Sequence, residues 1–255
     1  MSPYYEDAKR GIVLYHGSCD DVLPVLAAAS VDLVFTSPPY NLGNTSGGGF
    51  GGTDKAGKWR GAAIAHGYGA HADKMSHDEY VAWQKRVLLE CWRVVSDTGA
   101  IFYNHKPRVQ NGVVLLPLEM NPGLPVRQIV IWRRNGGINF APTHYCPTHE
   151  WIVVLAKPEW RLKSKGASGV GDVWDVAQEQ GNPHPAPFPL ALPARALETT
   201  GARSVLDPFA GSGTTLLAAK LAGVRAVGIE LEEKNCEMAA RRLSQETLPL
   251  FGEVA

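Results

Sequence analysis

The stretch "SVLDPFAGSGTTLLAA", residues 204–219, reads as an apolar strand, a glycine-rich turn and the start of a helix. This order is typical of open α/β sheets, in which the turn lies at the carboxyl end of a strand and its glycines let the backbone approach a ligand. The turn lacks the lysine of a phosphate-binding P-loop, and Leu216 stands where a dinucleotide fingerprint needs glycine or alanine. Asp207, just ahead of the turn, would repel a diphosphate and favours a cationic or zwitterionic ligand.

The rest of the chain alternates strands and helices in the same way. Ser76 and Glu79 form a capping-box pattern ahead of a helix over 77–95, a second helix follows the glycine turn as far as Gly223, and a third covers 232–244. We therefore predict an α/β fold with a doubly wound, mostly parallel sheet of seven strands. Two of these strands have no helix between them and should form an antiparallel hairpin at one edge. The predicted strands are 11–15, 31–35, 100–104, 127–132, 150–156, 203–207 and 225–230, the hairpin being 127–132 with 150–156.

Composition favours a single domain over residues 1–255. The chain has 45% hydrophobic residues, a net charge of zero and four cysteines without CxxC spacing. No apolar run reaches the length of a membrane span and the first residues lack a signal-peptide pattern, so we expect a soluble, cytoplasmic protein without a membrane partner. His144, Cys146 and His149 lie close together, but no fourth ligand accompanies them and we expect no metal.

Segment 43–74 is rich in glycine and has no apolar period, which predicts a long flexible loop. The predicted sheet uses nearly the whole chain, so no separate target-recognition domain is expected. Recognition of a large substrate would then fall to loops 41–75, 133–149 and 160–185, and basic residues in these loops suit a phosphate backbone.

The stretch "FTSPPYNLG", residues 35–43, follows the apolar run "VDLVF". Two consecutive prolines remove two backbone donors and fix both φ angles, so strand pairing must stop there and rigid carbonyls are left available. In most proteins such a sequence is a proline-terminated strand and turn.

The strand at 225–230 ends in Glu230, where an acid in such a sheet can accept both hydroxyls of a ribose. Asp207, the glycine turn and Glu230 together describe a site for a nucleoside that carries a positively charged amino-acid tail.

The motifs "TSPPY" (36–40) and "DPFAGSGTT" (207–215), in this order, resemble those of the β group of exocyclic-amine DNA methyltransferases, whose catalytic motif precedes the cofactor motif. The resemblance covers nearly the whole chain. "GSCDDVL" (17–23) resembles the family's adenine-contacting segment and "AVGIELEEKNCEMA" (226–239) its ribose-binding motif. "HEWIVVLAKP" (149–158) resembles a late sheet strand, and "HPAPFPLALPARAL" (184–197) the helix that closes over the methionine end of the cofactor.

The resemblance implies a Rossmann-like methyltransferase fold with permuted motif order and S-adenosylmethionine as cofactor. It implies that Asp207 accepts hydrogen bonds from the methionine ammonium, directly or through water, and that Glu230 holds the ribose. Asp20 would meet the adenine amino group, a task that Cys19 or Asp21 could share, although capping of a local helix explains Asp20 and Asp21 equally well. The cofactor-binding set is Asp20, Asp207, Pro208, Phe209, Gly211, Ser212, Gly213, Thr214 and Glu230.

The amino group of a nucleobase is a poor nucleophile, because its lone pair is delocalised into the ring. Ser37 Oγ and the Pro38 carbonyl are acceptors that Pro38 and Pro39 would hold rigid toward that amine, and Tyr40 would stack on a base flipped out of double-stranded DNA. In the resembling family a serine at this position is typical of cytosine-N4 enzymes and an aspartate of adenine-N6 enzymes. Ser37 therefore favours cytosine N4, with adenine N6 as the alternative.

Two further hypotheses remain open at the level of sequence: a methyltransferase for RNA or a free nucleobase, and an inactive cofactor-binding module. The intact motifs disfavour the second. A homodimer would help a chain of this size to surround a duplex, although nothing in the sequence shows an interface.

Overall fold

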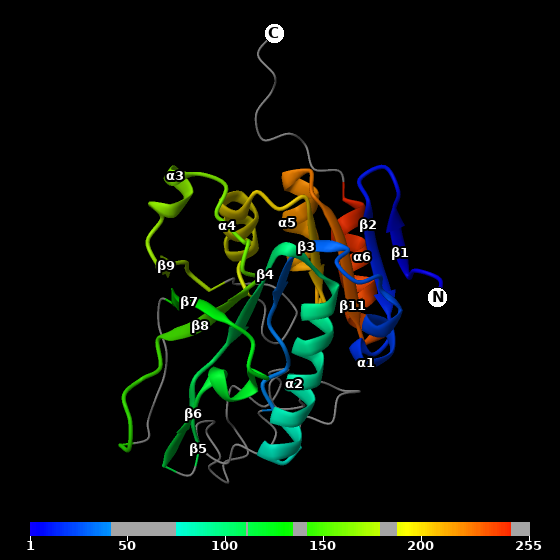
Figure 1. The fold of residues 1–255 in the computed structure, drawn as a ribbon. Helices are drawn as coiled ribbons and strands as arrows, with labels where there is room; N and C mark the ends of the chain where they lie inside the picture. The colour runs from blue at the N-terminus through cyan, green and yellow to red at the C-terminus, as the bar shows by residue number, and fades with distance from the viewer. Residues whose placement is uncertain (42–74, 111, 135–141, 179–187, 246–255) are drawn as a thin grey trace.

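The computed structural model describes residues 1–41, 75–110, 112–134, 142–178 and 188–245. Its centre is a nine-stranded sheet with helices on both faces (Figure 1). The strands, in spatial order, are β1 (Tyr5–Asp7), β2 (Ile12–His16), β11 (Arg225–Glu230), β10 (Ser204–Asp207), β3 (Val31–Thr36), β4 (Val95–His105), β8 (His149–Ala156), β7 (Val126–Arg133) and β9 (Val173–Asp175).

The remaining elements are short except for the helices that cover the sheet. β5 (Arg108–Gln110) and β6 (Val113–Leu115) form a separate two-stranded sheet. The helices are α1 (Cys19–Val22), α2 (His77–Val94), α3 (Lys165–Ser168), α4 (Ala191–Thr200), α5 (Thr214–Ala222) and α6 (Glu233–Ser244), with 3-10 turns η1 (Leu23–Val25) and η4 (Pro117–Met120).

The predicted α/β class and doubly wound, mostly parallel sheet are confirmed. β10 pairs in parallel with β3 and β11, β11 pairs with β2, and β3 pairs with β4. All seven predicted strands are present, but the predicted number was too low because β1 and β9 extend the sheet at its two ends. β4 also begins at Val95, directly after α2, rather than at residue 100, and its pairing with β3 is irregular between Val31 and Leu33.

The predicted hairpin exists, but it does not form the edge. β7 and β8 pair antiparallel, with Ile131 opposite Trp151, and β8 pairs antiparallel with β4. β9 adds in parallel to the outer side of β7. The outermost strand on this side is therefore β9 and not β7.

Each face of the sheet buries a separate apolar layer. Alternate residues of a strand point to opposite faces, so Phe102 of β4 packs on one side and Ile101 on the other. The first layer takes its helical residues from α4, α5 and α6, and the second from α1 and α2. This arrangement gives the two helical layers that a doubly wound sheet requires.

Predicted helix ends agree with the observed ones. Ser76 and Glu79 form the capping box of α2, and Gly223 ends α5 with a left-handed φ of 68°. α4 begins at Ala191, inside the stretch 184–197 that resembles the cofactor-closing helix. Gly213 directly precedes α5 and packs against α6. Its φ is 78°, and an added Cβ would meet Ala239 Cβ at 2.9 Å.

The two motifs that the sequence analysis singled out leave the sheet at the same edge. β3 and β10 are parallel neighbours, with Leu33 opposite Val205 and Val34 opposite Leu206. The SPPY segment (Ser37–Tyr40) and the glycine turn therefore start side by side, at the carboxyl ends of adjacent strands, which is where open α/β sheets bind ligands. The predicted flexible loop 43–74 lies outside the described residues.

Candidate active site

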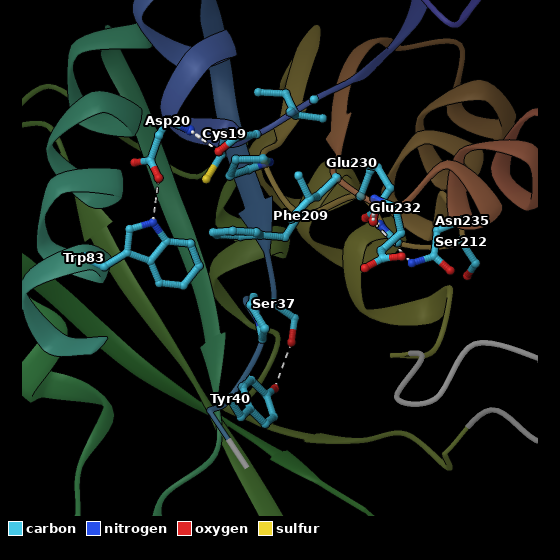
Figure 2. Close-up of a pocket in the computed structure, with 18 of the residues that line it drawn as sticks. Cys19, Asp20, Ser37, Tyr40, Trp83, Phe209, Ser212, Glu230, Glu232 and Asn235 are labelled. Atoms are coloured by element: carbon cyan, nitrogen blue, oxygen red, sulfur yellow. Dashed lines mark hydrogen bonds between the residues drawn. The ribbon is translucent and has the colours of Figure 1, made fainter. Parts of the chain in front are cut away.

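A cavity of about 710 Å³ opens at this edge of the sheet. That volume falls within the roughly 300–1,000 Å³ of small-molecule sites in proteins. Figure 2 shows Asp20 and Trp83 at one side of the cavity, Glu230 and Asn235 at the other, and Phe209 between them. Ser37 and Tyr40 lie below Phe209 in this view, so the SPPY segment and the glycine turn share one cavity.

Most of the predicted site residues line this cavity. They are Asp20, Ser37, Pro39, Tyr40, Pro208, Phe209, Gly211, Ser212, Thr214 and Glu230. Pro38, Asp207 and Gly213 do not line it. Gly213 has the packing role against α6 described above, and Pro38 is buried within the SPPY segment.

Asp207 is buried behind the glycine turn, with no exposed surface. One carboxylate oxygen accepts hydrogen bonds from Thr36 Oγ1 at 2.8 Å and from the Phe209 amide at 3.1 Å, and the other accepts from Thr215 Oγ1 at 2.7 Å. The contact with a ligand ammonium, directly or through water, stays a prediction, and in this geometry Asp207 has no surface on the cavity. Asp207 instead ties the end of β3 to the glycine turn and to α5.

Burial raises the pKa of the Asp207 carboxyl from 3.8 to about 6, against the opposing effect of its three donors. The folded protein thus binds this proton more tightly than the unfolded chain between about pH 4 and pH 6. Linkage makes the free energy of unfolding fall as the pH rises through that window. Relative to Asp207→Asn, the wild type should lose about 1.4 kcal/mol between about pH 5 and pH 7.5, measured by urea unfolding.

The matched control for this measurement is Asp97→Asn, which makes the same chemical change at an exposed position. We expect this control to stay within about 0.5 kcal/mol of the wild type at both pH values. An Asp207→Asn difference that does not vary with pH would contradict a carboxyl titrating near pH 6.

Glu230 lies at the end of β11 with its carboxylate on the cavity wall. One of its oxygens accepts from the Gly211 amide at 2.8 Å, and the other accepts from the Glu232 amide at 2.8 Å and from Asn235 Nδ2 at 3.2 Å. Burial raises the pKa of this carboxyl, while the donors oppose the rise. Glu230 thus shapes the glycine turn and presents an acid to the cavity, as predicted from its place at the strand end.

The opposite end of the cavity is aromatic. Trp83 of α2 lies 5.5 Å from Phe209 between ring centroids and donates its indole N–H to Asp20 Oδ2 at 2.9 Å. Ser18, and not Asp20, caps α1, because Ser18 Oγ accepts from the Asp20 amide at 3.1 Å. The Asp20 side chain is therefore held at the cavity by an aromatic residue that the sequence analysis did not assign to the site.

Cys19 also lines the cavity, but its thiol is unsuited to nucleophilic attack. Burial raises the pKa of Cys19 to about 12, with the neighbouring Asp20 carboxylate adding to the rise. A cysteine nucleophile needs thiolate character, which a lowered pKa supplies. The cavity therefore favours chemistry without a covalent enzyme intermediate.

The backbone of the SPPY segment and of Asn41 is held by side chains from two elements. Tyr80 of α2 donates to the Pro39 carbonyl at 2.8 Å, and Arg108 of β5 donates to the carbonyls of Tyr40 and Asn41 at 2.7 and 2.8 Å. Among the described residues, no donor contacts the Pro38 carbonyl. The expectation of available carbonyls thus holds within the described residues for Pro38, whereas the following carbonyls hold the segment in place.

Ser37 and Tyr40 share a polar cluster that sequence reasoning missed. Ser37 Oγ lies 2.8 Å from Tyr40 Oη, and Tyr40 donates to Glu150 Oε2 at 2.9 Å. Asn104 Nδ2 lies within 3.2 Å of Ser37 Oγ, 3.0 Å of Tyr40 Oη and 2.9 Å of Glu150 Oε2. One signal in the sequence could have revealed this cluster. Glu150 is a single acid at the start of the apolar run "HEWIVVLA", and a buried charge requires partners.

His105, the last residue of β4, is buried beside the SPPY segment. Its ring lies 4.6 Å from the Tyr40 ring, and its Nε2 is 2.9 Å from the Tyr80 hydroxyl. Burial lowers the pKa of His105 to about 3, so the ring is neutral at physiological pH. The His105 ring therefore packs against Tyr40 and lies within hydrogen-bond distance of Tyr80.

Two features common to other enzyme classes are not found in the described part of the chain. Its His, Cys, Asp and Glu side chains include no group of three or more placed to hold a metal ion, and Cys146 is exposed. No described helix is long and apolar enough to cross a membrane.

The residues around the cavity fit a nucleoside with an amino-acid tail. Trp83 and Phe209 offer apolar ring faces, Glu230 offers acceptors for hydroxyl groups, and Gly211 keeps a left-handed φ of 51° that leaves the backbone bare. The acids Asp20, Glu230 and Glu232 around the cavity suit a cationic ligand better than a phosphate.

Three comparisons place the chain among known proteins. It is 24% identical to the DNA adenine methyltransferase YhdJ of Escherichia coli strain K12, over 90% of this chain and 82% of that protein. TTHA0409 of Thermus thermophilus, solved in complex with S-adenosyl-L-methionine, is 25% identical, covers 91% of this chain and 95% of its own, and superposes with a TM-score of 0.61. The cytosine-N4-specific PvuII DNA methyltransferase, at 17% identity, covers 97% of this chain and 90% of its own with a TM-score of 0.72, a likeness of fold.

A family model with the description DNA methylase, covering the N6 and N4 types, matches residues 31–241. That range contains β3, the SPPY segment, the glycine turn and Glu230. The chain is a member of the N6/N4 DNA methylase family.

Proposed function

We propose that this DNA methylase transfers a methyl group from S-adenosylmethionine to the exocyclic N4 amine of a cytosine flipped out of double-stranded DNA. The observation that carries the proposal is Ser37 Oγ on the wall of the cavity, in a segment held by Tyr80 and Arg108. An acceptor in a rigid segment is preorganised for the amine, whose nitrogen becomes positively charged during the reaction.

S-adenosylmethionine is the cofactor, and it supplies an activated methyl group with its own leaving group. Glu230 would accept hydrogen bonds from the ribose hydroxyls, and Asp20 would accept from the adenine amino group near Trp83 and Phe209. Glu232 and Asn235 at the far side of the cavity are candidates for the polar tail. Asp207 supports this wall from behind through Thr36, Thr215 and the Phe209 amide.

Activation of the amine falls to the SPPY segment. Ser37 Oγ and the Pro38 carbonyl would accept the two amine hydrogens and draw the nitrogen toward tetrahedral geometry. Tyr40, backed by the His105 ring at 4.6 Å, would stack on the flipped base. Such stacking partly offsets an unstacking cost of about a few kcal/mol.

The choice of cytosine N4 over adenine N6 rests on Ser37, since an aspartate at this position is typical of the resembling adenine enzymes. Adenine N6 remains the second candidate, because the matching family model covers both amines and YhdJ is an adenine enzyme. Methylation of a ring carbon would need a cysteine thiolate for addition to the ring, which the raised pKa of Cys19 disfavours.

The test is the identity of the methylated nucleoside. Double-stranded DNA of mixed sequence is incubated with the purified protein and S-adenosylmethionine, digested to nucleosides and analysed by mass spectrometry. We expect N4-methyldeoxycytidine, and the Ser37→Ala variant assayed in parallel should yield far less. N6-methyldeoxyadenosine would establish the second candidate, and methylation of RNA but not of DNA would contradict both.

A further inference from the structure

The hydroxyl groups of Ser37 and Tyr40 form a chain that ends on the Glu150 carboxylate. A tyrosine has one hydroxyl hydrogen, and Tyr40 donates it to Glu150 Oε2 at 2.9 Å. Ser37 Oγ lies 2.8 Å from Tyr40 Oη, so in that contact Ser37 must be the donor. The direction of both bonds therefore follows from the acid at the end of the chain.

Glu150 is held as this terminal acceptor from two sides. Its Oε2 also accepts from Asn104 Nδ2 at 2.9 Å, and its Oε1 pairs with Arg134 Nη1 at 3.2 Å. The Glu150 side chain is 7% exposed, that of Arg134 is 10% exposed, and Asn104 is fully buried. An ion pair shielded from water in this way holds a negative charge at a fixed point.

Asn104 supports the same hydrogen-bond direction. Its Nδ2 faces three oxygens, of Ser37, Tyr40 and Glu150, all within 3.2 Å. The opposite amide orientation would turn an oxygen toward a carboxylate and is therefore disfavoured. Asn104 donates in this cluster, and its two amide hydrogens are shared among the oxygens of Ser37, Tyr40 and Glu150.

We infer that Glu150 is a positioning residue that fixes Ser37 Oγ as a hydrogen-bond acceptor toward the substrate base. With its own hydrogen committed to Tyr40, Ser37 can offer the cavity a lone pair but no hydrogen. A base that carries an amino group is therefore matched, and a base that carries a carbonyl at the same position is not. The inference rests on the proposed function and adds the origin of amine selectivity.

A glutamine at position 150 removes this control while keeping the size of the side chain. The glutamine amide can donate to Tyr40 Oη, Tyr40 can then donate to Ser37, and Ser37 is free to donate into the cavity. Ser37 would accept or donate according to the base that it meets. Tyr40→Phe cuts the same chain at its middle, keeps the stacking ring and likewise frees the Ser37 hydrogen.

The experiment compares the binding of two duplexes that differ at the target base. One carries the natural target, cytosine, and the other carries uracil, which has a carbonyl in place of the amine; hypoxanthine replaces adenine if adenine is the target. Dissociation constants are measured by fluorescence anisotropy with S-adenosylhomocysteine present, so no methyl transfer occurs. The readout is the ratio of the two constants for each protein, from which the effect of the mispair itself cancels between variants.

We expect the ratio of uracil to cytosine dissociation constants to be lower by about fivefold in Glu150→Gln than in the wild type, because one hydrogen bond is no longer mismatched. Tyr40→Phe should lower the ratio in the same direction. Glu159→Gln, which makes the same change at an exposed position outside the cluster, should keep the wild-type ratio. A loss of rigidity alone would weaken both duplexes together and leave the ratio unchanged.

The outcomes separate this inference from the proposed function. If the wild type methylates neither cytosine nor adenine in DNA, the proposed function fails. If the wild type methylates DNA and both variants, folded by circular dichroism, keep the wild-type ratio, the role assigned to Glu150 is overturned. Should Glu150→Gln fail to fold, an unchanged ratio in Tyr40→Phe overturns it by itself.

Discussion

Ser37→Ala is expected to lower kcat for methyl transfer about 100-fold while the dissociation constant of the cofactor stays within about twofold of the wild type. In the proposed mechanism Ser37 Oγ is the side-chain acceptor for the amine, and alanine leaves the nitrogen without it. The proposed cofactor contacts of Glu230 and the glycine turn lie elsewhere on the cavity wall. Single-turnover transfer of a labelled methyl group gives the rate, and calorimetry with S-adenosylhomocysteine gives the affinity.

Ser30→Ala is the matched control for this variant, because Ser30 is exposed and lies just ahead of the other end of β3. It should leave both kcat and cofactor affinity as in the wild type. A Ser37→Ala protein with wild-type turnover would remove Ser37 from the mechanism, and with it the main reason to favour cytosine N4.

Glu230→Ala is expected to weaken cofactor binding about 100-fold, which corresponds to about 2.7 kcal/mol, because hydrogen bonds from ligand hydroxyls to a carboxylate are lost. The substitution also removes the acceptor of the Gly211 and Glu232 amides, so the turn that would cradle the ligand loses its support. Calorimetric titration with S-adenosylhomocysteine measures the change directly and does not depend on DNA.

Glu198→Ala changes an exposed acid on α4 and should bind the cofactor like the wild type. Because Ser37→Ala is expected to keep cofactor affinity and Glu230→Ala is expected to lose it, the pair also tests the division of the cavity into two halves. Equal affinity in wild type and Glu230→Ala would show that another residue holds the ribose.

The sequence predicted the central part of the sheet because each strand there is buried on both faces and reads as a continuous apolar run. The edge strands gave no such signal. β1 is the three-residue segment "YED" and β9 is "VWD", both too short to recognise, and both form through pairing with a longer neighbour. The early start of β4 was missed for a similar reason. The segment "SDTG" is typical of a turn, but here it forms part of a strand that pairs with β3.

Local motifs located the glycine turn and the SPPY segment, but not the side chains that hold them. Asn104 lies opposite Ile152 on paired strands, and Glu150 lies two residues before Ile152 on the same face, 46 residues from Asn104 in the chain. That proximity depends on the antiparallel register of β4 and β8, which no short motif specifies. The position of Asp207 behind the turn was missed for the same reason, because its hydrogen-bond partner Thr36 of β3 lies 171 residues away.

The dimer, the base that is methylated and the loops that read DNA stay predictions. Segment 43–74 and parts of the other two proposed recognition loops lie outside the described residues.

The adjacency of β3 and β10 also bears on when this enzyme becomes competent during its synthesis. A nascent chain that has already left the ribosome as far as the SPPY segment still lacks β10 and the turn after it, which arrive more than 160 residues later. Translation must therefore pass Glu230 and Asn235 before all the segments that line the cavity can come together. A chain released before β10 should bind no cofactor.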